Sequence, residues 1–404
     1  MATLVASEGG ARLLSFCFYL LAARELTTSG FGVLRYTIAL STLAFGAAQV
    51  LANALTREVG AARGDRARSD EVLGSGLVLA GIVLAGSIAL CLVAAAAGLT
   101  SGADTVGLVV AVAGLAGFQL YYGIGRGLGE RMRPASTYVA GSLLQLAAFG
   151  LLAALANPAP RAALIVFGVS SLVPVLLWEL RKPVLWRRGL AVGSASIRRI
   201  VSLAAPLLLA ELAYLIWLSA DQIWIQHTFG SEQVGIYSAA KNLGQILIVI
   251  PAGTTAVLMP RTAELRTRAD VRHARRLVAA AALGVLAVCG AIGLVMILAR
   301  APLLGALYGD AYRAGASLLL ILAIGGVTNA GFVVLTTSAV GWGRPGVYTW
   351  SMALAAACEL LGLALLPSDR VTTAAWAVTG SITVALVAVA VWLLARPFAL
   401  DDRS

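Results

Sequence analysis

The chain has 404 residues, of which 60% are hydrophobic and only 12% are charged, and its mean hydropathy is +0.89. This composition provides too little polar surface to solvate a globule of this size, which excludes a water-soluble protein. The net charge of +11 is also common in nucleic-acid-binding proteins, but the positions of the basic residues indicate membrane topology instead.

Twelve apolar runs follow one another along the chain, and each approaches the length that crosses a hydrocarbon core of about 30 Å as a helix. They cover approximately residues 11–25, 31–56, 72–98, 105–125, 134–156, 162–180, 200–226, 234–258, 277–299, 315–339, 347–366 and 371–395. Short connectors join them and leave no room for a soluble domain. The sequence therefore predicts an all-α polytopic membrane protein with about 12 transmembrane helices.

The basic residues are distributed unequally between the two sides of the predicted membrane. Connectors that would share one side hold 22 of the 30 Lys and Arg residues, and those on the opposite side hold five. Because basic connectors stay in the cytoplasm, both termini are predicted to be cytoplasmic, with contact to membrane lipids and no nucleic acid as a partner. No basic leader or cleavage site precedes the first run, so we expect it to remain as an anchor in the cytoplasmic (inner) membrane.

Several local features refine this prediction. Pro174, Pro206 and Pro251 lie inside apolar runs and predict kinks. Residues 194–203 place apolar side chains at helical spacing beside two arginines, which predicts an in-plane helix before the seventh run. The four cysteines lack the paired spacing of a metal or redox site, so we expect no metal or cofactor.

The chain repeats itself with an offset of 203 residues. Residues 31–34 align with 234–237, and each segment follows a short polar turn and opens a long run that ends in a basic stretch. This predicts two parallel six-helix bundles, residues 1–190 and 191–404, around a central cavity. Such an arrangement is typical of a transporter.

Charged residues inside apolar runs are the main candidates for function, because an ionised side chain near the bilayer centre costs about 2.5–3.5 kcal/mol and needs compensation. We therefore expect these residues to face a wet interior. They are Arg12, Arg35, Glu211, Asp221, Lys241 and Glu359.

Asp221 and Lys241 lie at similar predicted depths, about 10 Å below the outer surface, and are within reach of each other across two neighbouring runs. They form either a structural ion pair or a transport site, in which Asp221 binds a cation or proton and Lys241 faces an anionic substrate. These interpretations are compatible if the substrate competes with Asp221 for Lys241.

Arg12 and Arg35 would add positive charge to the cavity wall, which suits an anionic cargo. Alternatively, Arg12 extends to the cytoplasmic interface and Arg35 pairs with Glu25. Glu211 and Glu359 lie deeper, and each is either a protonatable coupling site or a protonated carboxyl of structural value.

Catalytic signatures are missing from the sequence, so we do not expect an enzyme. The glycine-rich string at residues 123–129 ends an apolar run and precedes two arginines, whereas a phosphate-binding loop follows a strand. We interpret this string as a cytoplasmic turn.

Four short segments, residues 26–32, 234–240, 307–314 and 341–345, follow one another along the chain, and Asp221 lies between the first two. Together they resemble motifs of the polysaccharide transporter family, the Wzx-type O-antigen flippases of the multidrug, oligosaccharidyl-lipid and polysaccharide exporter superfamily. The resemblance covers nearly the whole chain, and the order and spacing of these segments carry it.

The resemblance implies a flippase that exports an undecaprenyl-diphosphate-linked oligosaccharide in polysaccharide biosynthesis by alternating access. By analogy, Arg12, Arg35 and Lys241 would bind the diphosphate. Asp221, Glu211 or Glu359 would couple transport to a proton or sodium ion, and glycan polymerases are possible partners. Two alternatives stay open: a cation-coupled multidrug or small-metabolite antiporter of the same superfamily, and a membrane enzyme or scaffold of glycan assembly.

Overall fold

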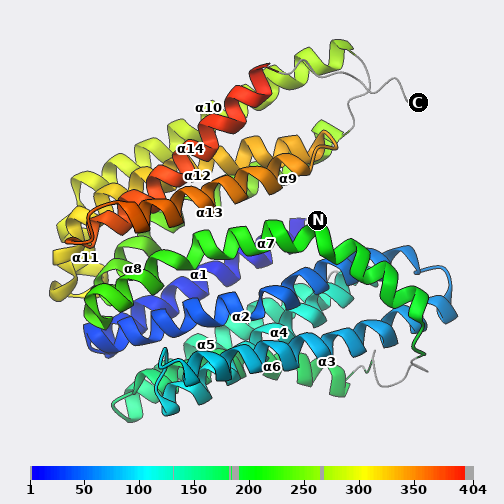
Figure 1. Ribbon diagram of the computed structural model, residues 1–404, viewed down its shortest axis with the longest axis horizontal. Helices are drawn as coiled ribbons and strands as arrows, with labels where there is room; N and C mark the ends of the chain where they lie inside the picture. The colour runs from blue at the N-terminus through cyan, green and yellow to red at the C-terminus, as the bar shows by residue number, and fades with distance from the viewer. Residues whose placement is uncertain (1, 131, 182, 184–190, 264–267, 396–404) are drawn as a thin grey trace. The chain divides into compact units, whose positions relative to one another are not determined.

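The computed structural model describes residues 2–130, 132–181, 183, 191–263 and 268–395 (Figure 1). Within these ranges all regular secondary structure is helical, as the apolar runs predict. Contacts divide the chain into two compact units, Met1–Leu215 (unit 1) and Ile216–Ser404 (unit 2). The predicted boundary at 190/191 concerns the sequence repeat, and it stays a prediction, as does the cavity expected between the halves.

Unit 1 contains six helices and the first part of a seventh. The helix pairs with the most extensive contacts are α2 with α4, α4 with α6, and α1 with α5. The bounds are α1 (Ala2–Glu25), α2 (Thr28–Ala61), α3 (Arg66–Ala96), α4 (Gly102–Gly127), α5 (Met132–Leu155), α6 (Pro160–Arg181) and α7 (Ser194–Phe229).

Unit 2 begins within α7 and is built around α12, which packs against α8, α9, α10, α13 and α14. The bounds are α8 (Ser231–Ile246), α9 (Val249–Ala263), α10 (Arg268–Leu298), α11 (Arg300–Tyr308), the 3-10 helix η1 (Asp310–Gly315), α12 (Ala316–Gly341), α13 (Gly346–Leu365) and α14 (Thr372–Ala395).

Eleven segments among the described residues are long and apolar enough to cross a membrane. Each overlaps one of the predicted runs, whereas the first run lies in α1, which is not among the eleven. Large apolar side chains are exposed along them, including Val93 at 63% and Leu394 at 82%. Contiguous apolar surface of this kind is stable in lipid but not in water. The protein is therefore a polytopic membrane protein.

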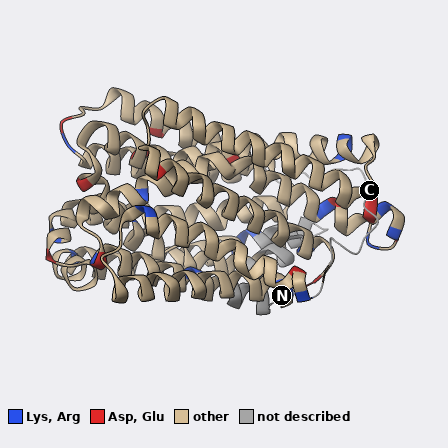
Figure 2. Cartoon of the chain, turned by 90° about the horizontal axis from the view of Figure 1, so that it is seen from below, with Lys and Arg blue, Asp and Glu red and all other residues tan. Residues whose placement is uncertain are grey.

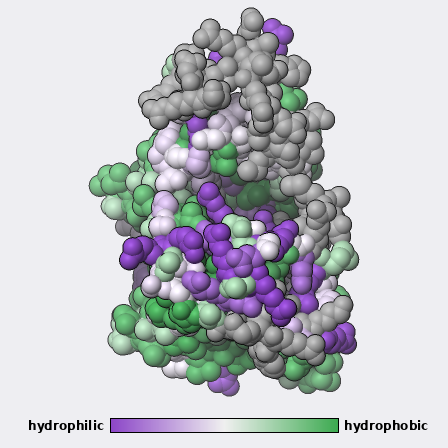
Figure 3. Space-filling view, turned by 90° about the vertical axis from the view of Figure 1, so that its right-hand side faces the viewer, coloured by the Kyte–Doolittle hydropathy of each residue, from purple (hydrophilic) through white to green (hydrophobic). Residues whose placement is uncertain are grey.

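Charged residues occur mainly towards the ends of the helices, and few lie along their middle parts (Figure 2). Hydrophilic side chains gather at the end of unit 1 where α2 ends and α3 and α7 begin (Figure 3). Arg57, Arg63, Arg66 and Arg198 are exposed in these connecting regions. Their distribution agrees with the charge bias used to predict topology.

The predicted in-plane helix at residues 194–203 is wrong as a separate element, because these residues are the first turns of the continuous helix α7. The sequence changes from mixed polar and apolar to mainly apolar near residue 203, and no helix-breaking residue lies at that point. Pro206 lies inside the helix and does not end it.

The predicted run 234–258 is interrupted, because α8 ends at Ile246 and α9 begins at Val249. Proline lacks an N–H group, so Pro251 cannot donate to the carbonyl of Leu247, four residues earlier. Instead, the thiol of Cys289 in α10 donates to that carbonyl at 3.6 Å. A side chain from another helix thus satisfies the group that proline leaves free.

Most of the glycine-rich string at 123–129 is helical, which corrects its interpretation as a turn. Gly123 lies so close to α2 that an added Cβ would meet the carbonyl oxygen of Ala52 at 2.5 Å. Thr56 donates to the carbonyl of Gly123 at 2.9 Å. Only Gly129, with φ +79°, has the left-handed conformation that ends the helix. The glycines therefore allow α2 and α4 to pack closely.

Candidate functional site

Three of the charged residues singled out in the sequence lie together in unit 2: Asp221 on α7, Lys241 on α8 and Glu359 on α13. Asp221 and Glu359 are 0% exposed, and Lys241 is 5% exposed. We call Asp221, Tyr237, Lys241 and Glu359 the buried charged cluster. Because burying charge is costly unless it is compensated, the partners of each member decide what the cluster can do.

Asp221 and Lys241 form an ion pair between α7 and α8, with 2.5 Å between Lys241 Nζ and Asp221 Oδ2. Lys241 also donates to the carbonyl of Leu218 at 2.8 Å. The two side chains are therefore directly paired in a nearly dry environment. This geometry is common to both interpretations of the pair, structural and functional.

Every oxygen of the Asp221 carboxylate has a partner. Oδ2 accepts from Tyr237 Oη as well as from Lys241, and Oδ1 accepts from the backbone N–H of Gln222 at 2.7 Å. A cation that binds Asp221 must therefore displace Lys241 or share the carboxylate with it. Among the described residues, no group of three or more His, Cys, Asp or Glu side chains is arranged to hold a metal ion.

Glu359 is the fourth member of the cluster. Neither of its carboxyl oxygens has a partner with hydrogen-bond geometry among the described residues. Asp221 and Lys241 lie within electrostatic range of it. The cluster thus contains two acidic groups and one basic group, so it carries an uncompensated negative charge unless one carboxyl is protonated.

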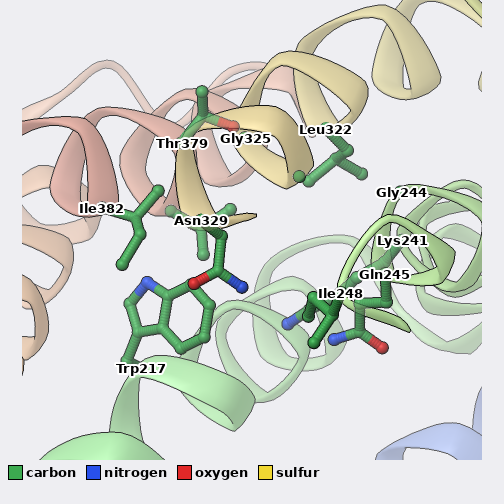
Figure 4. A pocket seen from close by; sticks show the side chains of 12 residues that line it. Trp217, Lys241, Gly244, Gln245, Ile248, Leu322, Gly325, Asn329, Thr379 and Ile382 are labelled. Carbon is green, nitrogen blue, oxygen red and sulfur yellow. The ribbon is translucent and has the colours of Figure 1, made fainter. Parts of the chain in front are cut away.

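A pocket adjoins this cluster and is lined by Lys241 and residues from α7, α8, α12 and α14. Figure 4 shows Trp217 and Asn329 beside each other, with Gln245 and Ile248 across the pocket. Its volume is about 40 Å³, room for a few water molecules. A drug-sized ligand needs a pocket of about 300 Å³ or more, so this form of unit 2 has space for water rather than for such a ligand.

Close helix packing forms one wall of this pocket. A Cβ added to Gly326 on α12 would meet the carbonyl oxygen of Gly244 on α8 at 2.5 Å. The two backbones therefore approach closely beside Lys241, and the lack of side chains at both glycines makes this possible.

The other three predicted site residues belong to unit 1. Arg35 on α2 is 7% exposed, and its guanidinium lies over the ring of Tyr19 on α1, 4.5 Å from the ring centroid. The structure contains no Arg35–Glu25 ion pair among its described residues, and Glu25 is exposed. Arg35 is therefore held by a cation–π contact rather than by the carboxylate considered from the sequence.

Arg12 on α1 is exposed, and Glu211 on α7 is partly exposed. Both lie within electrostatic range of Tyr214 on α7. The structure therefore brings Arg12 and Glu211 to one tyrosine in unit 1, which the sequence did not predict.

A second buried ion pair was missed in the sequence. Arg133 at the start of α5 is 9% exposed and lies 2.9 Å from Glu130 and 3.8 Å from Glu179 at the end of α6. Glu179 falls inside the predicted run 162–180. It therefore met the criterion used for the other six residues, a charged side chain inside an apolar run. Tyr237 was also missed as a partner of Asp221, although it lies in the repeated segment 234–237.

Residues 1–266 match the family described as polysaccharide biosynthesis protein, which is more than half of the chain. The chain belongs to this family. A second match, to the MatE family, covers residues 206–366. The family resemblance that the motifs indicate is thereby confirmed. A search of curated proteins finds no match.

Solved structures show the same fold. An inward-facing multidrug resistance MATE family transporter of the MOP superfamily is 16% identical, with a TM-score of 0.81 over 98% of this chain and 96% of that chain. The lipid II flippase MurJ is 10% identical, with a TM-score of 0.78 over 98% and 88%. A MOP superfamily transporter from Pyrococcus furiosus is 17% identical, with a TM-score of 0.61 over 98% and 97%. At these identities the likeness concerns the fold alone.

Proposed function

We propose that this protein is a flippase that moves an undecaprenyl-diphosphate-linked oligosaccharide across the cytoplasmic membrane by alternating access. The observation that carries the proposal is the match of residues 1–266 to the polysaccharide biosynthesis protein family. The fold adds support, since it is shared with a protein described as a lipid II flippase. The protein is not an enzyme on this proposal, and both its termini lie in the cytoplasm.

Arg12, Arg35 and Lys241 bind the diphosphate in this proposal. A diphosphate carries dense negative charge, and cationic side chains within a membrane protein are stable where such a partner or water compensates them. Arg12 is exposed and Arg35 is held over Tyr19. Lys241 is paired with Asp221, so the diphosphate competes with that carboxylate for its ammonium group.

The acidic residues Asp221, Glu211 and Glu359 couple transport to a proton or sodium gradient. Glu359 is the strongest candidate for the coupling group, because its buried carboxyl has no hydrogen-bond partner among the described residues. When Lys241 turns towards the diphosphate, Asp221 loses its cation and gains affinity for an incoming one. Membrane lipids surround the exposed apolar side chains, and glycan polymerases are the proposed protein partners.

Reconstituted liposomes test the transport reaction. The wild-type protein should move a labelled polyprenyl-diphosphate sugar between leaflets and should not move a cationic drug. Lys241→Met should lose this activity, whereas Arg370→Met, which removes an exposed cation, should retain it. Movement of the drug without movement of the lipid-linked sugar would overturn the proposal.

A cation-coupled multidrug or small-metabolite antiporter is the second candidate function. The observation in its favour is the MatE match over residues 206–366, which includes the whole buried charged cluster. The same liposome experiment separates the two functions by cargo. Accumulation of a lipid-linked sugar on the cytoplasmic leaflet after depletion of the protein would independently support the flippase.

A further inference from the structure

Three aromatic side chains from two helices pack together in unit 1, Phe118 and Tyr122 of α4 and Tyr138 of α5, and Tyr214 of α7 lies near them. We call these four residues the aromatic platform. The ring centroid of Tyr138 lies 5.4 Å from that of Phe118 and 6.1 Å from that of Tyr122. Phe118 and Tyr122 are stacked at 5.8 Å, and Tyr138 lies within electrostatic range of Tyr214.

The members of the platform differ in exposure. Phe118 is 7% exposed and packs within the core of unit 1. Tyr122, Tyr138 and Tyr214 are each partly exposed. Phe118 thus forms the buried base of the platform, and the partly exposed rings of the three tyrosines are accessible to a ligand.

Charged side chains border the platform on two sides. Arg12 and Glu211 lie within electrostatic range of Tyr214. The guanidinium of Arg126 lies over the Tyr122 ring, 5.6 Å from its centroid. Glu211 lies within α7, which is long and apolar enough to span a membrane, and its carboxylate is costly in lipid, so we expect this side of unit 1 to face water.

Ring faces bordered by charged hydrogen-bonding groups are suited to a sugar. The flat C–H face of a pyranose packs against aromatic rings, while carboxylate and guanidinium groups bind its hydroxyl groups. An acyl chain would not interact favourably with the charged groups, and an inorganic anion would not interact favourably with the ring faces. The combination of the two features therefore favours a glycan over either of these ligands.

We infer that the aromatic platform binds the sugar residue that follows the diphosphate in the lipid-linked substrate. This inference rests on the proposed function and adds a saccharide subsite to it. Arg12, which the proposed function assigns to the diphosphate, borders the platform through Tyr214. The first sugar then lies on the rings while the diphosphate lies at Arg12, and Glu211 accepts hydrogen bonds from sugar hydroxyl groups.

The alternative is that these tyrosines are part of the aromatic belt common at membrane interfaces. Rings in such a belt face lipid and have no preference for a glycan. Trp376 on α14 is 51% exposed among apolar side chains, and it provides an internal example of an exposed aromatic residue outside the platform.

The test compares two fluorescent lipids: undecaprenyl diphosphate, and the same lipid carrying one N-acetylhexosamine. Their binding to the purified full-length protein in nanodiscs is measured for Tyr138→Leu, Tyr122→Leu, Tyr138→Phe and Trp376→Ala. Leucine keeps apolar volume without a ring, and phenylalanine keeps the ring. We expect each leucine variant to bind the glycosylated lipid about fivefold to tenfold more weakly, and to bind the sugar-free lipid as the wild type does.

Trp376→Ala, outside the platform, should bind both lipids like the wild type, and Tyr138→Phe should weaken binding of the glycosylated lipid less than Tyr138→Leu does, because it keeps the ring. Equal weakening for the two lipids, or no weakening of the glycosylated one, would overturn the saccharide subsite and leave the proposed function standing. If the wild-type protein bound neither lipid, the proposed function and the subsite would fall together. Melting temperatures of all variants check folding, and Tyr122→Leu gives the result if Tyr138→Leu does not fold.

Discussion

Arg35 lies over the ring of Tyr19, and the sequence offset of 203 residues carries this pair onto Ser238 and Gln222, which are also in contact. Ser238 Oγ donates to Gln222 Oε1 at 3.3 Å, whereas Arg35 makes a cation–π contact at 4.5 Å. The same helix-to-helix contact therefore occurs in both halves with different chemistry. This correspondence supports the predicted repeat.

The offset also shows how the buried charged cluster differs from its counterpart in unit 1. Phe18 corresponds to Asp221, and Leu34 corresponds to Tyr237. Phe18 and Leu34 are both 0% exposed and apolar. Where unit 1 has two buried apolar side chains, unit 2 thus has a hydrogen-bonded carboxylate. At these two corresponding positions only unit 2 carries a buried charge, which is consistent with an asymmetric role in coupling.

Removing one partner of the Asp221–Lys241 pair should be strongly destabilising. Lys241→Met leaves a fully buried carboxylate without its cation, and we expect a loss of about 3–5 kcal/mol in the free energy of unfolding. The double variant Asp221→Asn with Lys241→Met should recover most of this loss. Thermal unfolding in detergent measures it, and Arg313→Met, in a pair that is 60% and 84% exposed, should change stability by less than about 1 kcal/mol.

The charge swap Asp221→Lys with Lys241→Asp separates structure from transport. We expect the swapped protein to regain stability but not transport in liposomes, because the ammonium and the carboxylate are then on the wrong helices for the substrate and the coupling ion. Full recovery of transport would mean that the pair is structural only.

Glu359→Gln should leave the fold intact and abolish ion-driven transport. Glutamine has the shape of a protonated carboxyl, and the native group has no hydrogen bond among the described residues to lose. We therefore expect a melting temperature equal to or above that of the wild type, with transport reduced at least about tenfold, as for loss of a coupling group. Glu232→Gln, in the first turn of α8, serves as a matched control. Normal transport by Glu359→Gln would rule out Glu359 as the coupling group.

Gly123→Ala should destabilise unit 1, because its Cβ would lie 2.5 Å from the carbonyl oxygen of Ala52. Forcing α2 and α4 apart should cost about 1–3 kcal/mol. Gly290→Ala in α10 is the matched control, since no atom lies within 4 Å of its added Cβ. It should be neutral or stabilising by up to about 1 kcal/mol. Equal melting temperatures for the two variants would contradict close packing at Gly123.

The pair Arg133 and Glu179 should respond asymmetrically to substitution. Arg133→Met removes a cation 3.8 Å from Glu179, which is 4% exposed, and should lower the free energy of unfolding by about 3–5 kcal/mol. Glu179→Gln should cost less, because Arg133 keeps Glu130 at 2.9 Å. Chemical denaturation of both variants measures the difference, and similar losses would show that Glu130 does not compensate Arg133.

Most of the fold follows from local patterns, because a bilayer requires each spanning segment to be long, apolar and helical. The break between Ile246 and Val249 was missed because hydropathy is continuous there. The break depends on Pro251, which lacks an N–H group, and on the Cys289 thiol of α10, which donates to the carbonyl left free. Similarly, the start of α7 has the composition of a surface helix, but tertiary packing continues it into the spanning helix.

The sequence by itself determined that the chain spans a membrane, where its spans lie, and which charges require compensation, because insertion into lipid depends on composition along the chain. The Asp221–Lys241 pair was among the interpretations of the sequence. Only the tertiary structure decided the other partners: Tyr237 for Asp221, Tyr19 for Arg35, and Glu179 for Arg133. Hydropathy records how deep a residue lies but not the direction in which it points around its helix. That direction is set when helices pack, and it determines which side chains meet.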